Sequence, residues 1–310
     1  MPILRAPNVT FAAALAAALV TAGCASRAVN VQPLRADPAV FAGWTCAALH
    51  DEIDSVQQRA ADVAYAVDER AGNNVIMLSL GVAVFWPALI AMRPDGPDAA
   101  ELARLKGRHD ALVSAAAAKT CPPATDVLAP ERAAALPIAL GERLVYEERS
   151  PGVRGARVVG LKLAALRRGA LEFDADVAGT ALGQRWATDL NGNLAPRSSA
   201  LLHWSRLLKA TVALGDVLSG ELYAGSGEAP ARVRGQVIAL GVQNTLDRPF
   251  DAAVIELFGD APTPTGSHRV DGVMVVDRKS GTLLRLELRS AHPDFALRRT
   301  LQRIEPAGAR

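Results

Sequence analysis

The sequence is poor in the residues that usually reveal catalysis or a highly charged partner. Its 310 residues include only three cysteines, and aromatic residues make up 5%. Basic and acidic residues nearly balance, 34 against 32, so no strong overall field would attract nucleic acid. No C-x-x-C, H-E-x-x-H, G-x-S-x-G or phosphate-binding loop is present. We therefore expect a chain that is not an enzyme and that binds no nucleic acid, metal or cofactor.

Two polar groupings leave alternatives open. The first is His268 with Asp271 and Asp277, and His292 with Asp294, which a β-sheet would have to bring together to form an enzyme site. The second is the D-L-N-G-N sequence at 189–193, which has the start of a calcium loop but lacks its later carboxylates. The first grouping is more typical of solvated turns, and the second of a hairpin turn.

The chain also lacks an uninterrupted apolar run of membrane-spanning length near its start. Residues 11–20, FAAALAAALV, are too short to span a bilayer, and the small residues 21–23 lead directly into Cys24. This pattern resembles the signal of bacterial lipoproteins, although Thr21 stands where that family usually has leucine. The resemblance implies removal of residues 1–23, acylation of Cys24 (palmitate among the acyl chains) and a periplasmic location. No aspartate follows Cys24, which in that family favours the outer membrane.

Lipidation of Cys24 would leave two cysteines, and an oxidising compartment favours a disulfide between Cys46 and Cys121. Apolar residues recur with heptad spacing after Cys46 and again before Cys121, which predicts two antiparallel helices. We therefore predict a tether at 24–43 and a disulfide-linked helical hairpin at 44–121. In this pairing Ala60 lies opposite Gly107, where two small residues would allow the helices to approach closely.

The segment between the two helices is strongly apolar. Residues 75–92 contain no charge, but Gly81 and Pro87 interrupt them, and a single span would separate Cys46 from Cys121 across the membrane. We therefore expect an apolar hairpin tip, with Phe85 and Trp86 as candidate contacts to a membrane or a partner. Packing within the protein remains the alternative.

Four short elements of this region resemble uncharacterised Gram-negative envelope lipoproteins. They are Trp44-Thr45-Cys46, Phe85-Trp86-Pro87, Leu105-Lys106-Gly107 and Lys119-Thr120-Cys121. The resemblance implies an envelope location and the same disulfide, and no activity.

Beyond a proline-containing linker at 122–137, the texture of the chain changes to short apolar runs separated by turn residues. We predict a β-rich domain at 138–308 with strands at 142–148, 156–166, 170–176, 184–189, 217–223, 232–241, 252–258, 270–277 and 282–289. Residues 201–214 are the best helix candidate, with a strand as the alternative. The predicted class is α+β, with an antiparallel half-barrel or sandwich.

The sequences at 141–147 and 271–281 weakly resemble strands of periplasmic half-barrel proteins, some of which carry lipids. The leading hypothesis is a non-catalytic interaction or scaffold protein, anchored by lipid to the periplasmic face of the outer membrane and contacting another envelope protein or a lipid. The alternative is a carrier of a hydrophobic ligand in the half-barrel, and an envelope enzyme is a third.

Overall fold

The computed structural model describes residues 33–71, 97–124, 126–194, 201–224 and 229–308. The signal segment, Cys24 and the apolar segment 75–92 with Phe85 and Trp86 lie outside these residues. Among the described residues, no helix combines the length and apolar character needed to cross a membrane.

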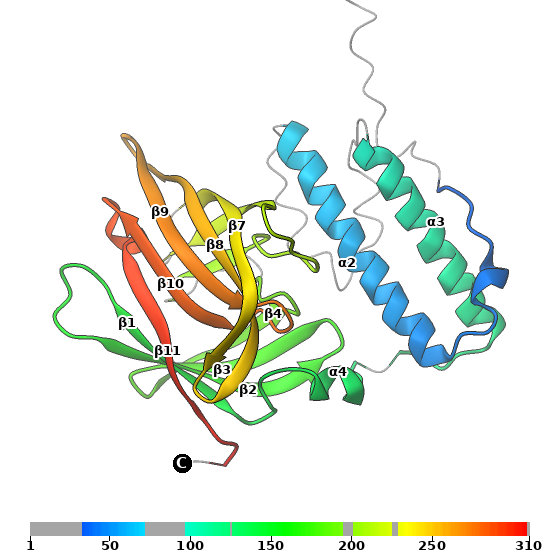
Figure 1. Ribbon diagram of the computed structural model, residues 1–310, viewed down its shortest axis with the longest axis horizontal. Coiled ribbons are helices and arrows are strands. Elements are labelled where there is room, and N and C mark those ends of the chain that lie inside the picture. The colour runs from blue at the N-terminus through cyan, green and yellow to red at the C-terminus, as the bar shows by residue number, and fades with distance from the viewer. Residues whose placement is uncertain (1–32, 72–96, 125, 195–200, 225–228, 309–310) are drawn as a thin grey trace, which may run out of the picture.

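Two long helices lie side by side next to the β-domain (Figure 1). The helix α2 (Cys46–Ala71) follows a short 3-10 helix, η2 (Pro38–Phe41), and α3 (Pro97–Ala118) runs antiparallel to α2. The predicted disulfide joins Cys46 to Cys121 with a Cα–Cα distance of 5.5 Å. The predicted seam is also present, because its residues Leu49, Val56, Ala60, Leu102, Leu105, Leu112 and Ala116 form one buried cluster. Thr45 caps α2, since its Oγ1 accepts a hydrogen bond from the Ala48 N–H at 3.2 Å.

The segment 122–137 includes a short helix, α4 (Pro130–Ala134), and packs along the end of the sheet. Leu128 is buried, its N–H donates to the carbonyl of Leu166, and Val127 forms an isolated bridge with Arg167.

The β-domain is one antiparallel sheet of eleven strands. The strands are β1 (Arg143–Arg149), β2 (Arg157–Arg167), β3 (Ala170–Val177), β4 (Thr180–Asp189), β5 (His203–Ser205), β6 (Val217–Tyr223), β7 (Ala231–Thr245), β8 (Arg248–Thr263), β9 (Gly266–Asp277), β10 (Leu283–Ser290) and β11 (Leu297–Glu305). Their spatial order is β4-β3-β2-β1-β11-β10-β9-β8-β7-β6-β5. Strands that are consecutive in sequence therefore pair, except that β4 and β5 form the two edges and β1 pairs with β11.

The sheet curves around a single core, and its two edges nearly meet. Leu194 pairs with Thr188 of β4 on one side, and its N–H donates to the carbonyl of Trp204 in β5 at 2.9 Å on the other. Buried side chains from all eleven strands, including Trp204 of β5, form one cluster that fills the space inside. Of the two predicted architectures, a rolled single sheet corresponds to the half-barrel rather than to two stacked sheets.

The sequence-based predictions fail at two places in this sheet. Residues 201–214 are not helical, because Arg206 adopts a left-handed backbone conformation (φ 59°) and the Asn193 side chain holds the main chain of Leu208. The strand β11 is absent from the sequence-based predictions, since Arg298, Arg299 and Arg303 obscure its apolar positions Leu297 and Leu301. A short 3-10 helix, η5 (Pro293–Phe295), precedes it.

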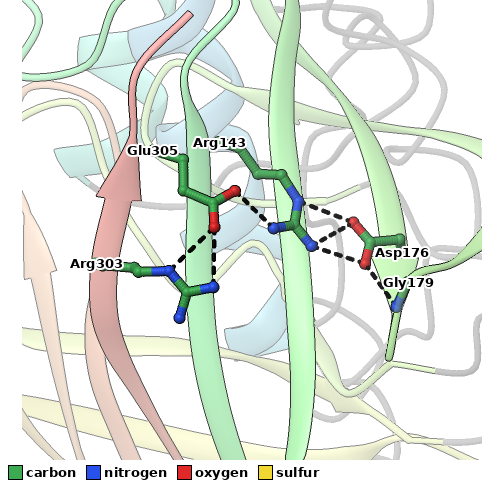
Figure 2. A network of polar contacts seen from close by, with 5 residues as sticks. All are labelled: Arg143, Asp176, Gly179, Arg303 and Glu305. Carbon is green, nitrogen blue, oxygen red and sulfur yellow. Dashed lines mark hydrogen bonds and ion pairs between the residues drawn. The ribbon is translucent and has the colours of Figure 1, made fainter. Parts of the chain in front are cut away.

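A network of ion pairs ties three strands together on the outer face of the sheet (Figure 2). Arg143 of β1 binds Asp176 of β3 through Nε and Nη2, and its Nη1 lies 2.8 Å from Glu305 Oε2 of β11. Arg303 binds the other oxygen of Glu305. The hydrogen bond from Arg143 is the main cause that lowers the pKa of Glu305. Gly160 of β2 lies beneath Arg143 and Asp176, where a Cβ atom would come within 2.2 Å of both side chains.

Two turns from distant parts of the chain dock backbone to backbone. In the turn 189–193, the Asp189 carboxylate accepts hydrogen bonds from the N–H groups of Asn191 and Asn193. The D-L-N-G-N sequence therefore forms a turn that is held by hydrogen bonds between its own residues. Gly281, in the turn between β9 and β10, packs against it, and a Cβ atom there would lie 2.1 Å from the Asn191 carbonyl oxygen. The two turns cover one end of the rolled sheet.

We expect Gly281→Ala to destabilise the protein more than Gly215→Ala. Both glycines have positive φ, 64° and 86°, so each substitution carries a backbone cost of about 1–2 kcal/mol. Only at Gly281 would the added Cβ atom meet another backbone, which adds about 1–3 kcal/mol of overpacking. Thermal unfolding of the two variants measures the difference, and equal losses would show that the turns do not dock as described.

Candidate functional site

A row of charged side chains crosses three adjacent strands on the inner face of the sheet. Glu148 of β1 lies opposite Arg157 of β2 and Arg299 of β11 in the strand register. The Glu148 carboxylate binds Arg157 through one oxygen and Arg299 through the other, the latter with an Nε–Oε2 distance of 2.6 Å. The next pairs along these strands are apolar, since Tyr146 lies opposite Val159 and Leu301. The charged row therefore marks the boundary between a polar mouth and an apolar interior.

The burial of this row differs from one side chain to the next. The Glu148 side chain is fully buried and that of Arg299 is 4% exposed, whereas Arg157 is 44% exposed. Arg299 also donates from Nη1 to the carbonyl oxygen of Leu202 at 2.9 Å, which attaches the segment before β5 to the opposite wall. Removing one member of a buried ion pair leaves the charge of the other member uncompensated. Glu148 and Arg299 therefore each stabilise the charge of the other in its buried position.

A groove of about 360 Å³ lies outside this row, at the mouth of the rolled sheet. The loop between β1 and β2 forms one wall, and η5 with the start of β11 forms the other. In Figure 1 the β1–β2 loop lies on the side of the domain away from α2 and α3. The volume of the groove is in the range of small-molecule sites, which are often found at the mouths of β-barrels.

The interior behind the row is filled. The space left between Tyr146, Phe173, Trp186, Leu194 and Arg299 is a cavity of about 40 Å³. This volume accommodates one or two water molecules, not an acyl chain. Trp204 belongs to the same core, and its side chain is buried against this cavity.

The histidine grouping is brought together only in part. The rings of His268 and His292 lie 6.2 Å apart in a T-shaped arrangement, and His292 also packs against Phe295. Asp271 is paired with Arg269. Asp277 lies in the turn at the other end of β9, where its buried carboxylate accepts hydrogen bonds from the Asp251 and Ser280 N–H groups. Within the described ranges, no group of three or more histidine, cysteine and acidic residues has the arrangement of a metal site.

The helical pair contacts the β-domain through acidic residues of α2. Asp54 forms an ion pair with Arg168 in the turn between β2 and β3. Asp62 accepts a hydrogen bond from the backbone N–H of Ala210 in the loop after β5, and it lies near Asp189 and Lys209. Burial at this contact, with the Asp189 charge as a smaller cause, raises the pKa of Asp62 to about 6. The polar face of α2 is thus partly a docking face.

The backbone nearest to an added Cβ atom at Gly107 is that of the tether. A Cβ atom on Gly107 would lie 1.6 Å from the carbonyl oxygen of Leu34, in the tether. The Leu34 N–H donates to the Ala103 carbonyl at 3.0 Å, so the tether lies directly against α3. Contact with the tether backbone is therefore a physical reason for glycine at this position. His109 lies between α2 and α3, where the distance between its Nε2 and the side-chain amide nitrogen of Gln57 is 3.3 Å.

Sequence reasoning missed the whole mouth site. Arg157, Glu148 and Arg299 are separated by up to 151 residues, and Arg299 belongs to the unpredicted strand β11. The only local signal is the alternation within the strands. Glu148 lies two residues from Tyr146 and Arg299 two residues from Leu301, so each charged residue faces the same side of its strand as an inward-facing apolar residue.

Comparison with known proteins assigns no family to the chain. No family model matches it, and no curated protein matches it. One similar solved structure is a protein from Bacteroides fragilis described as exported with a YmcC-like fold, at 14% identity and a TM-score of 0.36, covering 55% of this chain and 98% of that one. Another is YmcC from Escherichia coli, described as a lipoprotein, at 13% identity and a TM-score of 0.32, covering 56% and 94%. A third, from Parabacteroides distasonis and also described as a lipoprotein, has 12% identity and a TM-score of 0.32, covering 54% and 96%. At these TM-scores the likenesses support no conclusion about this chain.

We expect Gly107→Ala to release the tether without unfolding the helices. Alanine favours a helix over glycine by about 1 kcal/mol, but its methyl group would displace Leu34. Trypsin should therefore cleave faster after Arg35, while the helical circular dichroism is retained. Gly43→Ala is the control, because no atom lies within 4 Å of its added methyl group. Unchanged cleavage in Gly107→Ala would contradict the tether contact.

The raised pKa of Asp62 predicts a stability that falls as pH rises. The folded state holds the proton more tightly than the unfolded state, whose pKa is near 3.8, so the free energy of unfolding decreases between pH 4 and pH 6 and then levels off. Asp62→Asn should remove this slope and raise stability at pH 7 by up to about 3 kcal/mol.

The measurement is denaturant unfolding at pH 5 and pH 7. The control is Asp260→Asn, which removes the same charge from an exposed position on β8. A variant Asp62→Asn that is less stable than the unsubstituted protein at pH 7 would show that the charged carboxylate is favoured at this contact.

Proposed function

We propose that the chain is an exported lipoprotein, anchored through acylated Cys24 to the periplasmic face of the outer membrane, with a non-catalytic interaction or scaffold role. The observation that carries this proposal is the disulfide between Cys46 and Cys121. Disulfides persist mainly in exported proteins, so its presence supports export. It also uses both other cysteines, which leaves Cys24 as the one remaining thiol, at the end of an apolar signal-like run.

The filled interior supports an interaction role over a carrier role. A carrier of a long hydrophobic chain needs an enclosed volume several times larger than the cavity of about 40 Å³. The lipid at Cys24 would be a permanent anchor, because several acyl chains together bind a bilayer almost irreversibly.

The arrangement of the helices suggests where a partner would bind. The helices α2 and α3 are antiparallel and linked by the disulfide at one end, and the chain connects their other ends through residues 72–96. We propose that this segment is the tip of a helical hairpin and that its apolar residues, Phe85 and Trp86 included, contact a membrane or another envelope protein.

Cys24→Ala should release the protein from membranes. We expect the variant in the soluble fraction after cell lysis and a carbonate wash, whereas Ser26→Ala should stay in the membrane fraction. Intact mass spectrometry of the unsubstituted mature protein should give a chain that begins at residue 24 and carries acyl groups. A mature chain that begins elsewhere, or a Cys24→Ala protein that resists the wash, would refute lipid anchoring at this residue.

A further inference from the structure

The groove at the mouth combines arginine side chains with apolar walls, as expected of a binding site for a singly charged anion that carries an apolar chain. We propose that it binds an anionic amphiphile, a molecule with one carboxylate or phosphodiester group and a short apolar chain. This inference goes beyond the proposed anchoring and interaction role, because it concerns the folded domain alone and holds whether or not Cys24 is acylated.

The charges around the groove leave an excess of one positive charge. The guanidinium groups of Arg154 and Arg157 line the groove, and that of Arg299 lies directly behind it, paired with Glu148. The carboxylates of Glu148 and Asp294 belong to the lining, so these five groups together carry one excess positive charge. Glu148 is shared between Arg157 and Arg299, so the buried row is itself positively charged. An anion that bound beside it would offset this charge in a partly desolvated place, where electrostatic interactions are stronger than in water.

Two arginines are available to such an anion. Arg157 is 44% exposed and belongs to the groove lining. Arg154 lies in the exposed β1–β2 loop, also in the lining, and has no ion-pair partner among the described residues. Guanidinium groups bind carboxylate and phosphate oxygens with paired, charge-assisted hydrogen bonds.

The remaining walls are largely apolar, which excludes a purely ionic site. They are formed by Pro151, Val153, Leu202, Ala224, Pro293 and Leu297. Val153 is 67% exposed in the absence of a ligand, although it lies at the edge of a groove and not on a flat surface. Pro151, Val153 and Pro293 are exposed, and an apolar chain against them would remove their surface from water.

Asp294 limits the charge that the groove accepts. It lies in η5, on the wall opposite Arg154, and its carboxylate has no ion-pair partner in the described part of the chain. Its negative charge opposes a second anionic group at that wall. A monoanion, with its charge held at the arginine side, therefore fits better than a polyanion.

The test is isothermal titration calorimetry of the purified full-length protein with octanoate as the probe. Octanoate should bind, whereas octanol, octylammonium, acetate and inorganic phosphate should each bind at least tenfold more weakly. Equal binding of octanol would show a merely apolar groove, and equal binding of phosphate or acetate a site for free anions. Either result would overturn the proposal.

Matched variants locate the site. Arg154→Gln and Arg157→Gln should each weaken octanoate binding about tenfold, whereas Arg298→Gln, which removes the same charge from an exposed position on β11, should not. Val153→Ser should weaken it several-fold and Val242→Ser should not, although the two valines are similarly exposed at 67% and 70%.

Asp294→Asn gives a prediction of opposite sign. It should strengthen octanoate binding two- to threefold, because the repulsion from its carboxylate is removed, and a general loss of structure would not do this. Octanoate affinities that are the same in Arg154→Gln, Arg157→Gln and the unsubstituted protein would place the ligand elsewhere and refute the inference.

Discussion

The pairing of β1 with β11 is the constraint on which the rest of the β-domain depends. These strands come from the beginning and the end of the domain, and their pairing joins the meander β1–β4 to the meander β5–β11 in one sheet. The buried ion pair of Glu148 with Arg299 crosses this junction on the inner face, and that of Arg143 with Glu305 crosses it on the outer face. A slip of one residue would turn Glu148 and Arg299 away from each other, so a buried pair of this kind specifies register as much as stability.

The same ion pair separates the two spaces in the rolled sheet. Behind it the apolar core is closed to anything larger than water, and in front of it the mouth widens into a groove with charged residues at its floor. The function of the domain is therefore expected at the mouth and on the outer surface. Buried charge is expensive, and the arrangement of two arginines around one carboxylate limits that cost while leaving a positive site open to solvent.

The helical pair is attached to this domain by contacts of a different kind. The ion pair of Asp54 with Arg168 and the hydrogen bond between Asp62 and Ala210 join α2 to the turn and loop at the end opposite the mouth. The tether lies on α3, against Gly107. A protein anchored through its N-terminus would thus hold the helices between the tether and the β-domain, with the mouth on the far side (Figure 1).

The sequence by itself determined the elements that depend on local pattern: the heptad seam from Leu49 to Ala60, the disulfide between the two cysteines that remain beside Cys24, and nine of the eleven strands. It could not reveal β11, whose charged residues mask its inward positions, or the fate of 201–214, where Arg206 and Asn193 override a helical spacing. The mouth with Glu148, Arg157 and Arg299 exists only because β1 pairs with β11. Such non-local pairing is decided by the total burial of the folded chain, and no short stretch of sequence carries it.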